Sequence, residues 1–284
     1  MILKLMHRAL KEVQSLDPVR DYQRIAYLMA THEFPFDTTR ALEFALFRTY
    51  AVPAIGCLLA HTREFIDRTQ KRYDDTDLIL SEIVENGIDS ERGKAAFRRM
   101  NRMHGHHHPI ANEDFLYVLS TFIYEQVRFN GRFGWRLMTE KERLGLFYFW
   151  REVGRRMGIR DIPQSYEEYE QFNINYEKTR FQFTEGGQRV AASTRDLFIG
   201  WFLPKWCYPA VRPFIYALLD DPLREAFRFP KAPFLVSVLT HFALRTRAVA
   251  LRFFPERTKP KLRTEMKNLS YPQGYRIEDL GSRP

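Results

Sequence analysis

Apolar residues recur at helical spacing along most of the chain. From 38 to 50, for example, they fall at positions 42, 45, 46 and 50, which lie on one face of a helix. No stretch alternates apolar and polar residues as a half-buried strand does, and no internal repeat is present. The pattern predicts an all-α fold, with one multi-helix domain spanning residues 1–284 around a single core.

Capping residues and helix breakers divide this pattern into separate helices. Asp17–Pro18 predicts a helix start, Asn86–Gly87 predicts a helix end, and Thr139–Glu142 has the sequence of a capping box. The predicted helices span about 18–29, 38–50, 53–60, 67–85, 90–105, 113–128, 140–158, 166–183, 188–202 and 232–253. A proline-broken apolar hairpin is predicted at 204–219, and 255–284 is predicted to be an extended C-terminal tail.

The composition is typical of a globular protein. Hydrophobic residues make up 45% of the 284 positions and include 24 Phe, enough for a sizeable core. Cys57 and Cys207 form no CxxC pair, which disfavours a disulfide framework and favours a cytoplasmic location. The first residues contain no apolar run of the kind that signal peptides carry. No uninterrupted apolar run approaches the roughly 18 residues of a membrane-spanning helix, so we expect none.

The net charge of +9 admits nucleic acid, an anionic membrane or an anionic ligand as partner. The basic residues are spread over the whole chain and form no nucleic-acid-binding motif, so we expect no nucleic acid partner. The helix at 232–253 is predicted to belong to the core with a basic outer face. The alternative is peripheral membrane contact through Arg245, Arg247 and Arg252.

The segment 98–115 lies at the junction of two predicted helices and is rich in residues that bind metals or anions. It holds Arg98, Arg99 and Arg102, and four of the eight histidines of the chain. Imidazole is the commonest protein metal ligand, and the planar arginine fork binds carboxylates and phosphates. His104 follows Met100 by one turn, so the two share a helix face from which a haem ligand would project. The alternative is a buried or capping histidine.

Two further groups of ligand-type residues allow other chemistry. His106, His107 and His108 with Glu113 or Asp114 would make a non-haem metal cluster, the alternative being solvated loop histidines. A magnesium site at 74–77 is disfavoured, because on a helix its aspartates do not all face the same way.

Arg72 and Thr76 form a second polar concentration. They lie four residues apart in the predicted helix 67–85 and are therefore neighbours on one face. A cation beside a hydroxyl could hold a carboxylate or assist bound dioxygen. The alternative is a solvated face of arginine–aspartate pairs. The motifs of serine hydrolases, P-loop NTPases and zinc proteases are absent from the sequence.

Taken together, six motifs in this order resemble the MpaB/latex-clearing (rubber) oxygenase superfamily, especially its shorter MpaB-like members. They cover nearly the whole chain: Phe34-Pro-Phe-Asp37, Arg68-x-x-Lys-Arg-Tyr-Asp-Asp-Thr76, Met100-Asn-Arg-Met-His104, Asn112-Glu-Asp-Phe-Leu-Tyr-Val-Leu119, Met157-Gly-Ile-x-x-Ile-Pro163 and Tyr271-Pro-x-Gly-Tyr275.

The resemblance implies an all-helical domain that holds haem b through one axial histidine and cleaves a carbon–carbon double bond of an isoprenoid chain. His104 matches the axial iron ligand, and Arg72 and Thr76 match the arginine and hydroxyl that line the haem pocket. We expect Arg72, Thr76, Arg99, Met100 and Arg128 to contact the cofactor, since propionates need cations. Arg98 and Arg102 are further cations near in sequence.

The chain departs from the rubber-cleaving branch at several positions. Asp75 stands where that branch has a lysine, and Asn101 and His108 stand where it has arginines beside the ligand. For the catalytic glutamate of the rubber-cleaving branch, this chain offers only Glu43 and Glu64 as weak candidates. We also expect no membrane anchor of the kind that the fungal MpaB-like relatives carry.

We therefore expect a haem-dependent oxygenase whose partners are dioxygen and a small apolar, isoprenoid- or lipid-like substrate. The alternatives are a non-haem metalloprotein using His104, His106, His107 and Asp114, and a non-enzymatic helical protein that binds haem or lipid. The predicted substrate walls are Phe115, Leu116, Leu119 and Phe122 with the aromatic segments 147–150 and 198–201.

Overall fold

A computed structural model describes residues 7–105 and 110–281, and these residues contain helices and no β-strand. The all-α prediction is confirmed. In chain order the elements are α1 Arg8–Ser15, α2 Tyr22–Leu28, the π-helix η1 Met29–Glu33, α3 Pro35–Tyr50, α4 Pro53–Thr62, α5 Glu64–Asp67, α6 Thr69–Asn86, α7 Glu91–Gly105, α8 Asn112–Phe133, α9 Glu140–Arg156, α10 Tyr166–Arg180, α11 Glu185–Gly200, the 3-10 turn η2 Lys205–Cys207, α12 Tyr208–Tyr216, α13 Asp221–Ala226, α14 Phe234–Leu251 and the 3-10 turn η3 Ile277–Asp279.

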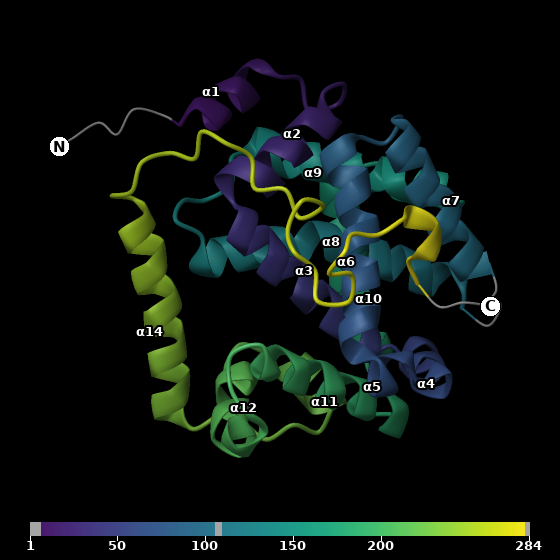
Figure 1. Cartoon of the computed structure of the whole chain (residues 1–284), viewed down its shortest axis with the longest axis vertical. Helices are drawn as coiled ribbons and strands as arrows, with labels where there is room; N and C mark the ends of the chain where they lie inside the picture. The colour runs from purple at the N-terminus through teal and green to yellow at the C-terminus, as the bar shows by residue number, and fades with distance from the viewer. Residues whose placement is uncertain (1–6, 106–109, 282–284) are drawn as a thin grey trace.

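The main core forms where the long central helices pack in pairs. α3 packs along α8, α6 along α7, and α2 against α9 (Figure 1). Apolar side chains from these helices, among them Ile25, Ile83, Leu119 and Trp150, form one buried cluster. Burial of this surface is the main driving force for the fold. It also fixes α6, α7 and α8 relative to one another, and these are the helices that carry the site residues.

A second cluster lies where α11 packs against α4 and α3. The pair Gly186–Gly187 was predicted to precede this helix, but both glycines lie in its first turn, after the cap Thr184. A Cβ on Gly187 would lie 2.4 Å from the carbonyl oxygen of Tyr50, and one on Gly56 would lie 2.9 Å from the Cα of Gly187. The glycines therefore permit a close α4–α11 approach that no side chain would allow.

Local capping signals predicted some helix boundaries well and others badly. Thr139 and Glu142 form the predicted capping box at the start of α9. The prediction at Asp17 is wrong. Its carboxylate accepts hydrogen bonds from the backbone N–H groups of Val19 and Arg20, which makes a turn, and α2 begins only at Tyr22. The short helices α1 and α13 were not predicted.

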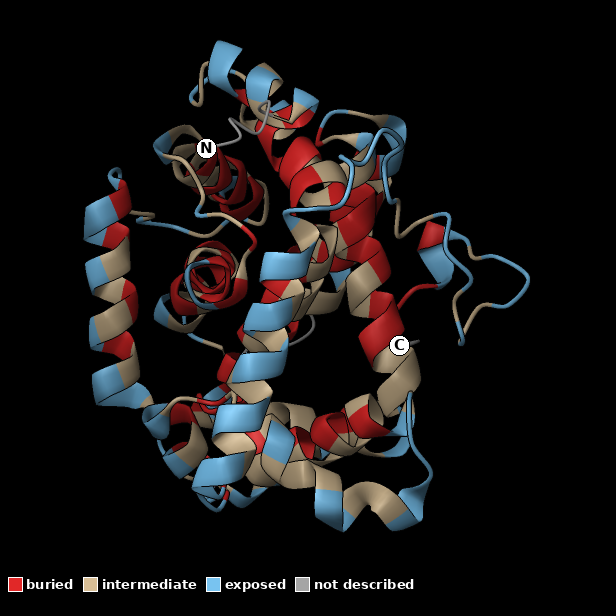
Figure 2. Cartoon of the chain, turned by 90° about the vertical axis from the view of Figure 1, so that its left-hand side faces the viewer, coloured by how far each residue is buried: buried red, intermediate tan, exposed pale blue. Residues whose placement is uncertain are grey.

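The predicted orientation of α14 is also wrong. Phe234, Leu235 and Phe242 point to solvent, whereas Arg247 pairs with the buried carboxylate of Asp37 at 3.0 Å (Figure 2, where α14 faces the viewer). The outer face therefore carries large apolar side chains, and Arg245 and Arg252 of the predicted basic face are exposed as well. By length and composition alone, α14 is also apolar enough to cross a membrane, which the search for an uninterrupted apolar run overlooked. A single helix of this kind is weak evidence for a membrane span.

The C-terminal tail runs across α6 (Figure 1). Its side chains meet the acidic residues on the outer face of that helix in five polar contacts: Arg263 with Asp77, Thr264 with Glu85, Ser270 with Asp74, Tyr271 with Asp75 and Tyr275 with Glu82. The aspartates of 74–77 thus hold the tail. Among the described residues, no group of three or more His, Cys, Asp or Glu side chains could hold a metal ion.

Candidate functional site

A cavity of about 430 Å³ lies between α3, α4, α6, α7, α8 and α9. Its walls are mostly apolar and include Leu58, Leu59, Phe65, Met100, Phe115, Leu119, Phe122 and Trp150. The polar side chains in its lining are Thr49, Thr62, Glu64, Arg72, Thr76 and His104. An apolar cavity of this size with a few polar groups is typical of a small-molecule or cofactor site. His104, Arg72, Thr76 and Met100, four of the predicted site residues, share this lining.

Arg72 and Thr76 form the polar part of α6 that faces the cavity. The Arg72 Nη1 atom donates a hydrogen bond to the Thr76 hydroxyl at 2.6 Å, and its guanidinium lies 5.1 Å from the centre of the Phe65 ring. Within the residues that the structure describes, Arg72 makes no salt bridge. Burial lowers the pKa of this guanidinium, although arginine stays protonated in proteins. The cavity therefore presents a half-buried positive charge that has no ion-pair partner among the described residues.

His104 reaches the same cavity from the last turn of α7. Its ring meets Phe115 edge-on, with the ring centres 5.7 Å apart. Met100, one turn earlier, also lines the cavity, so the predicted shared face of these two residues is present. Phe97, a further turn back, is buried in the main core instead.

Two of the predicted cofactor contacts lie outside the cavity lining. The Arg99 Nε atom donates to the carbonyl oxygen of Leu280 in the tail. Arg128 pairs with Glu125 at 3.1 Å and donates to the side chain of Asn173 at 2.7 Å. The structure therefore does not bring these two arginines to His104. The carbonyl oxygen of Leu280 binds Arg99, and Glu125 and Asn173 bind Arg128.

The structure describes only some of the residues proposed for the alternative non-haem metal cluster. His106, His107 and His108 lie outside the described residues. The Asp114 carboxylate accepts a hydrogen bond from the hydroxyl of Tyr176. Asn101, at one of the departures from the rubber-cleaving branch, donates to the carbonyl oxygen of Arg156.

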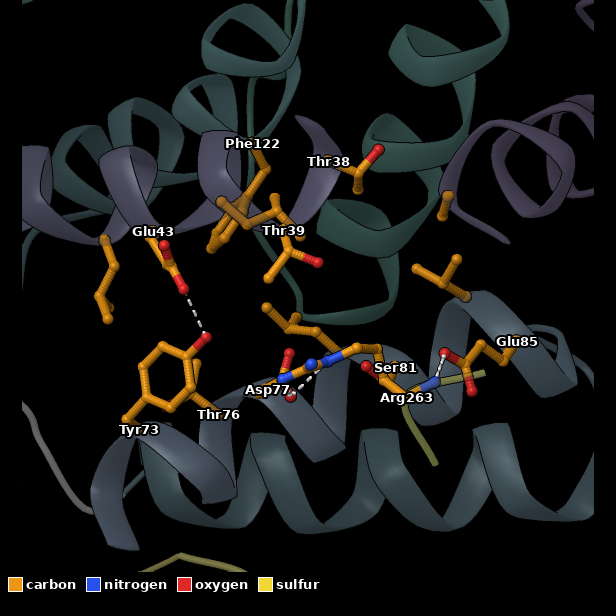
Figure 3. A pocket seen from close by; sticks show the side chains of 15 residues that line it. Thr38, Thr39, Glu43, Tyr73, Thr76, Asp77, Ser81, Glu85, Phe122 and Arg263 are labelled. Atoms are coloured by element: carbon orange, nitrogen blue, oxygen red, sulfur yellow. Dashed lines mark hydrogen bonds and ion pairs between the residues drawn. The ribbon is translucent and has the colours of Figure 1, made fainter. Parts of the chain in front are cut away.

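The acidic candidates fall in different places. Glu64 lines the cavity and pairs with Arg68. Asp75, where the rubber-cleaving branch has a lysine, is buried outside the lining and pairs with Lys71 at 2.8 Å. Glu43 accepts a hydrogen bond from the Tyr73 hydroxyl at 2.8 Å (Figure 3). It also pairs with Arg40 at 2.6 Å.

Glu43 belongs to a smaller pocket of about 70 Å³ beside the cavity. Leu46, Thr76, Leu80 and Phe122 line both spaces, so α3, α6 and α8 form the wall between them. Burial raises the pKa of Glu43 to about 7. Sequence reasoning missed this pocket because its polar groups come from α3, α6 and the tail, which are far apart in the chain.

The predicted substrate walls are present in part. Phe115, Leu119, Phe122 and Trp150 line the cavity, whereas Leu116 does not. The segment 198–201 also lies elsewhere, with Phe198 and Trp201 packed against Tyr73. The sequence analysis did not identify the contribution of α4 and α5, because short apolar helices do not reveal which face they turn inward.

The catalytic-domain model of the family described as "ER-bound oxygenase mpaB/B'/Rubber oxygenase" matches residues 38–252. The chain belongs to this family. The predicted resemblance to the MpaB/rubber oxygenase superfamily is thus confirmed. The matched region begins in α3 and ends just after α14, so it includes the whole cavity lining and excludes the tail.

Two fungal relatives within the mpaB family are similar over most of this chain. The ER-bound oxygenase mpaB' of Penicillium brevicompactum is 31% identical over 242 residues, which make up 79% of this chain and 57% of that protein. The ER-bound oxygenase mpaB of Penicillium roqueforti (strain FM164) is 30% identical over 257 residues, 81% of this chain and 86% of that protein. The chain therefore spans little more than half the length of the mpaB' relative.

Proposed function

We propose that the protein is a haem b-dependent oxygenase that cleaves a carbon–carbon double bond of an apolar, isoprenoid- or lipid-like substrate. The observation that carries the proposal is the cavity in which His104, Arg72 and Thr76 are the polar groups expected from the family, set among apolar walls. Membership of a family of named oxygenases supports the reaction class. The cofactor and the substrate are inferred from the chemistry of the cavity.

The residues present fit an iron porphyrin. The macrocycle needs apolar walls, one nitrogen ligand for the iron and a cation for its carboxylates. The cavity offers Met100, Phe115 and Trp150 as walls and His104 as ligand, and it offers Arg72 as a cation that makes no salt bridge within residues 7–105 and 110–281. When bound, the haem would supply the iron chemistry that activates dioxygen.

The chain itself then performs binding, orientation and exclusion of water. His104 would hold the iron from α7, and the helix spacing places Met100 beside it. The Arg72 guanidinium would bind a propionate or stabilise negative charge on reduced oxygen, and the hydrogen bond to Thr76 keeps it in one orientation. The apolar walls exclude water and would accept an unsaturated hydrocarbon chain.

The substrate class follows from the same walls. A sugar or nucleotide bound against Leu58, Leu119 and Trp150 would leave hydrogen-bonding groups without partners, at a cost of about 1–3 kcal/mol for each. An isoprenoid or unsaturated lipid has few such groups. We therefore propose dioxygen and an apolar unsaturated molecule as the two substrates, with aldehydes or ketones as products.

The proposed location is a membrane surface facing the cytoplasm. Two relatives are named ER-bound oxygenases, and an apolar substrate of this kind would itself be dissolved in a bilayer. Peripheral contact is compatible with a helical domain that carries its own apolar surface.

Oxygen consumption by the haem-loaded protein, combined with trapping of carbonyl products, tests the proposal. We expect turnover with polyprenyl, terpenoid or unsaturated fatty substrates and none with their saturated counterparts, because only the former contain a bond to cleave. Turnover of hydrophilic compounds alone would overturn the substrate class. Firm haem binding without any turnover would favour the carrier or sensor alternative.

A further inference from the structure

The outward side of α14 is largely apolar, with Arg245 and Thr246 exposed between Phe242 and Val249. Phe234, Leu235, Val238, Leu239, Phe242 and Val249 recur at helical spacing and are exposed, followed by Phe253 and Phe254 just beyond the helix. We call these eight residues the α14 outer face. Phe234 and Phe253, near its two ends, are each 84% exposed. Contiguous exposed apolar surface on this scale marks an interaction site.

Polar contacts on the inner side hold α14 against the domain. Arg247 pairs with Asp37, and the His241 ring stacks on Phe133 with the ring centres 5.5 Å apart. At the C-terminal end, the Arg252 Nε atom donates to the carbonyl oxygen of Trp135 at 2.8 Å. These contacts fasten the helix along its length, so the outer face is presented by a folded domain. A spanning orientation would require all of them to break.

The charged residues within 227–255 all have one sign, and the next acidic residue along the chain is Glu256. Residues 227–255 contain Arg228, Lys231, Arg245, Arg247 and Arg252 and not one Asp or Glu. The neighbouring turn before α12, whose helix contacts α14, also lacks acidic residues and exposes Trp206 at 82% beside Lys205. Exposed aromatic side chains interspersed with cations are the composition of a surface that binds the interface of an anionic bilayer.

We propose that the α14 outer face docks the protein on a membrane surface that contains anionic lipids, with α14 lying in the interface plane. Apolar side chains enter the acyl boundary, and Lys231 and Arg245 meet the lipid headgroups. The inference rests on the membrane contact proposed above and is independent of the cofactor. Such docking holds the oxygenase domain at the phase in which apolar substrates are dissolved.

A second copy of this chain is a poorer occupant of the same surface. A two-fold contact would place the face against itself, so Lys231 and Arg245 of both copies would be brought into one interface. Residues 227–255 supply no carboxylate to offset that repulsion. The phosphate groups of lipids and the carboxylates of phosphatidylserine supply an excess of the negative charge that a second copy lacks.

Co-flotation of the full chain with vesicles tests the proposal. We expect the protein to float with vesicles of phosphatidylcholine mixed with phosphatidylserine, and less with phosphatidylcholine alone. The double variant Phe234→Gln/Phe242→Gln should lower partitioning at least tenfold, because two large apolar side chains no longer enter the membrane. The matched control is Leu137→Gln/Leu269→Gln, which changes two equally exposed apolar residues elsewhere and should bind as the parent does.

Three results would overturn the docking proposal. They are no flotation of the parent chain, equal loss in the control variant, and a vesicle-free dimer that Phe234→Gln/Phe242→Gln dissociates. Lys231→Gln/Arg245→Gln should weaken binding to the anionic vesicles and leave binding to phosphatidylcholine unchanged. Haem binding measured on the same variants should be unaffected, so failure of the docking face and failure of the proposed cofactor are told apart.

Discussion

The guanidinium of Arg72 points at the hydroxyl of Thr76, one helical turn away, with 2.6 Å between Nη1 and Oγ1. The same hydroxyl donates to the backbone carbonyl oxygen of Arg72 at 3.0 Å, so its proton is already committed and its lone pairs face the cation. Arg72 is therefore the hydrogen-bond donor of this pair, and Thr76 holds its guanidinium in one orientation in an apolar cavity. Arg72 makes no salt bridge with any described residue, and desolvation of such a charge opposes folding, so the arrangement favours a site that binds something negative.

Replacement of Arg72 by Met should separate stability from binding. Removing this half-buried charge, which has no ion-pair partner in the part of the chain that the structure describes, should raise the free energy of unfolding of the cofactor-free protein by about 1–2 kcal/mol. The same change should lower haem retention at least tenfold, since the cavity loses its cation. Denaturant titration and haem titration measure the two effects.

Lys94→Met is the matched control for this experiment, because Lys94 lies on the exposed side of α7 and should change neither property. Lys71 is unsuitable as a control, since it pairs with the buried Asp75. Equal haem affinity in the Arg72 and Lys94 variants would mean that Arg72 serves only the solvated face of α6.

Glu43 should make stability fall with increasing pH. Folding raises the pKa of this carboxyl from 4.5 to about 7, so between these values the folded protein keeps a proton that the unfolded chain has lost. Its contribution to the free energy of unfolding is therefore full below pH 4.5, falls by roughly 3 kcal/mol as pH rises to 7, and is constant above. The charged groups facing it are Arg40, Asp77 and Arg263.

Glu43→Gln should remove this dependence while it keeps the hydrogen bond from Tyr73. Denaturant unfolding at several pH values between 4.5 and 8 would show a flatter profile for the variant than for the parent. Glu91→Gln, on the exposed side of α7, is the control. Identical profiles of the Glu43 variant and the parent would contradict the burial of a neutral carboxyl in this pocket.

Part of this site was predictable because it is local in sequence. Arg72 with Thr76 and Met100 with His104 are four residues apart, and any helix places such pairs on one face. The cap at Thr139 is likewise a short-range signal. Agreement of local spacing with family motifs therefore identified the residues that share the cavity.

The remaining features depend on which elements pack together, and helical periodicity does not contain that information. Arg99 and Arg128 were expected at the cofactor because they are basic and near in sequence, but Leu280 and Glu125 hold them elsewhere. The partner of Asp77 is Arg263, 186 positions away. The sequence of α14 distinguishes an apolar side of the helix from a basic side. Which side meets solvent depends on the residue with which Arg247 pairs, and helical periodicity does not identify that residue.

The contact of Asp77 with Arg263 should be strongly coupled. The Arg263 Nη2 atom lies 2.6 Å from the Asp77 carboxylate, and burial raises the pKa of Asp77 despite this cation. Arg263→Met should destabilise the protein by about 3 kcal/mol, because it leaves a buried charge unpaired. Adding Asp77→Asn should recover most of that loss. A double-mutant cycle by denaturant unfolding measures the coupling, and additive effects would mean that the tail does not hold α6 through this pair.

Gly56→Ala should disrupt the α4–α11 approach. The added Cβ would lie 2.5 Å from the carbonyl oxygen of Tyr50, a backbone atom that cannot rotate away. We expect a loss of about 1–3 kcal/mol in the free energy of unfolding. Gly131→Ala in α8, where the new Cβ meets no atom within 4 Å, should instead stabilise by about 0.5–1 kcal/mol. A tolerated Gly56 substitution would show that the two helices are not this close.

The visible absorption spectrum of the haem-loaded protein tests the central claim most directly, with parent, His104→Ala and His61→Ala compared at equal haem. The parent and the His61→Ala control, changed at an exposed histidine on α4, should show the same Soret band and the same shift on reduction. His106→Ala and His107→Ala should behave as the parent does. His104→Ala should lose the haem or its normal ferric spectrum. An unchanged spectrum in His104→Ala would contradict the account, because another residue would then ligate the iron.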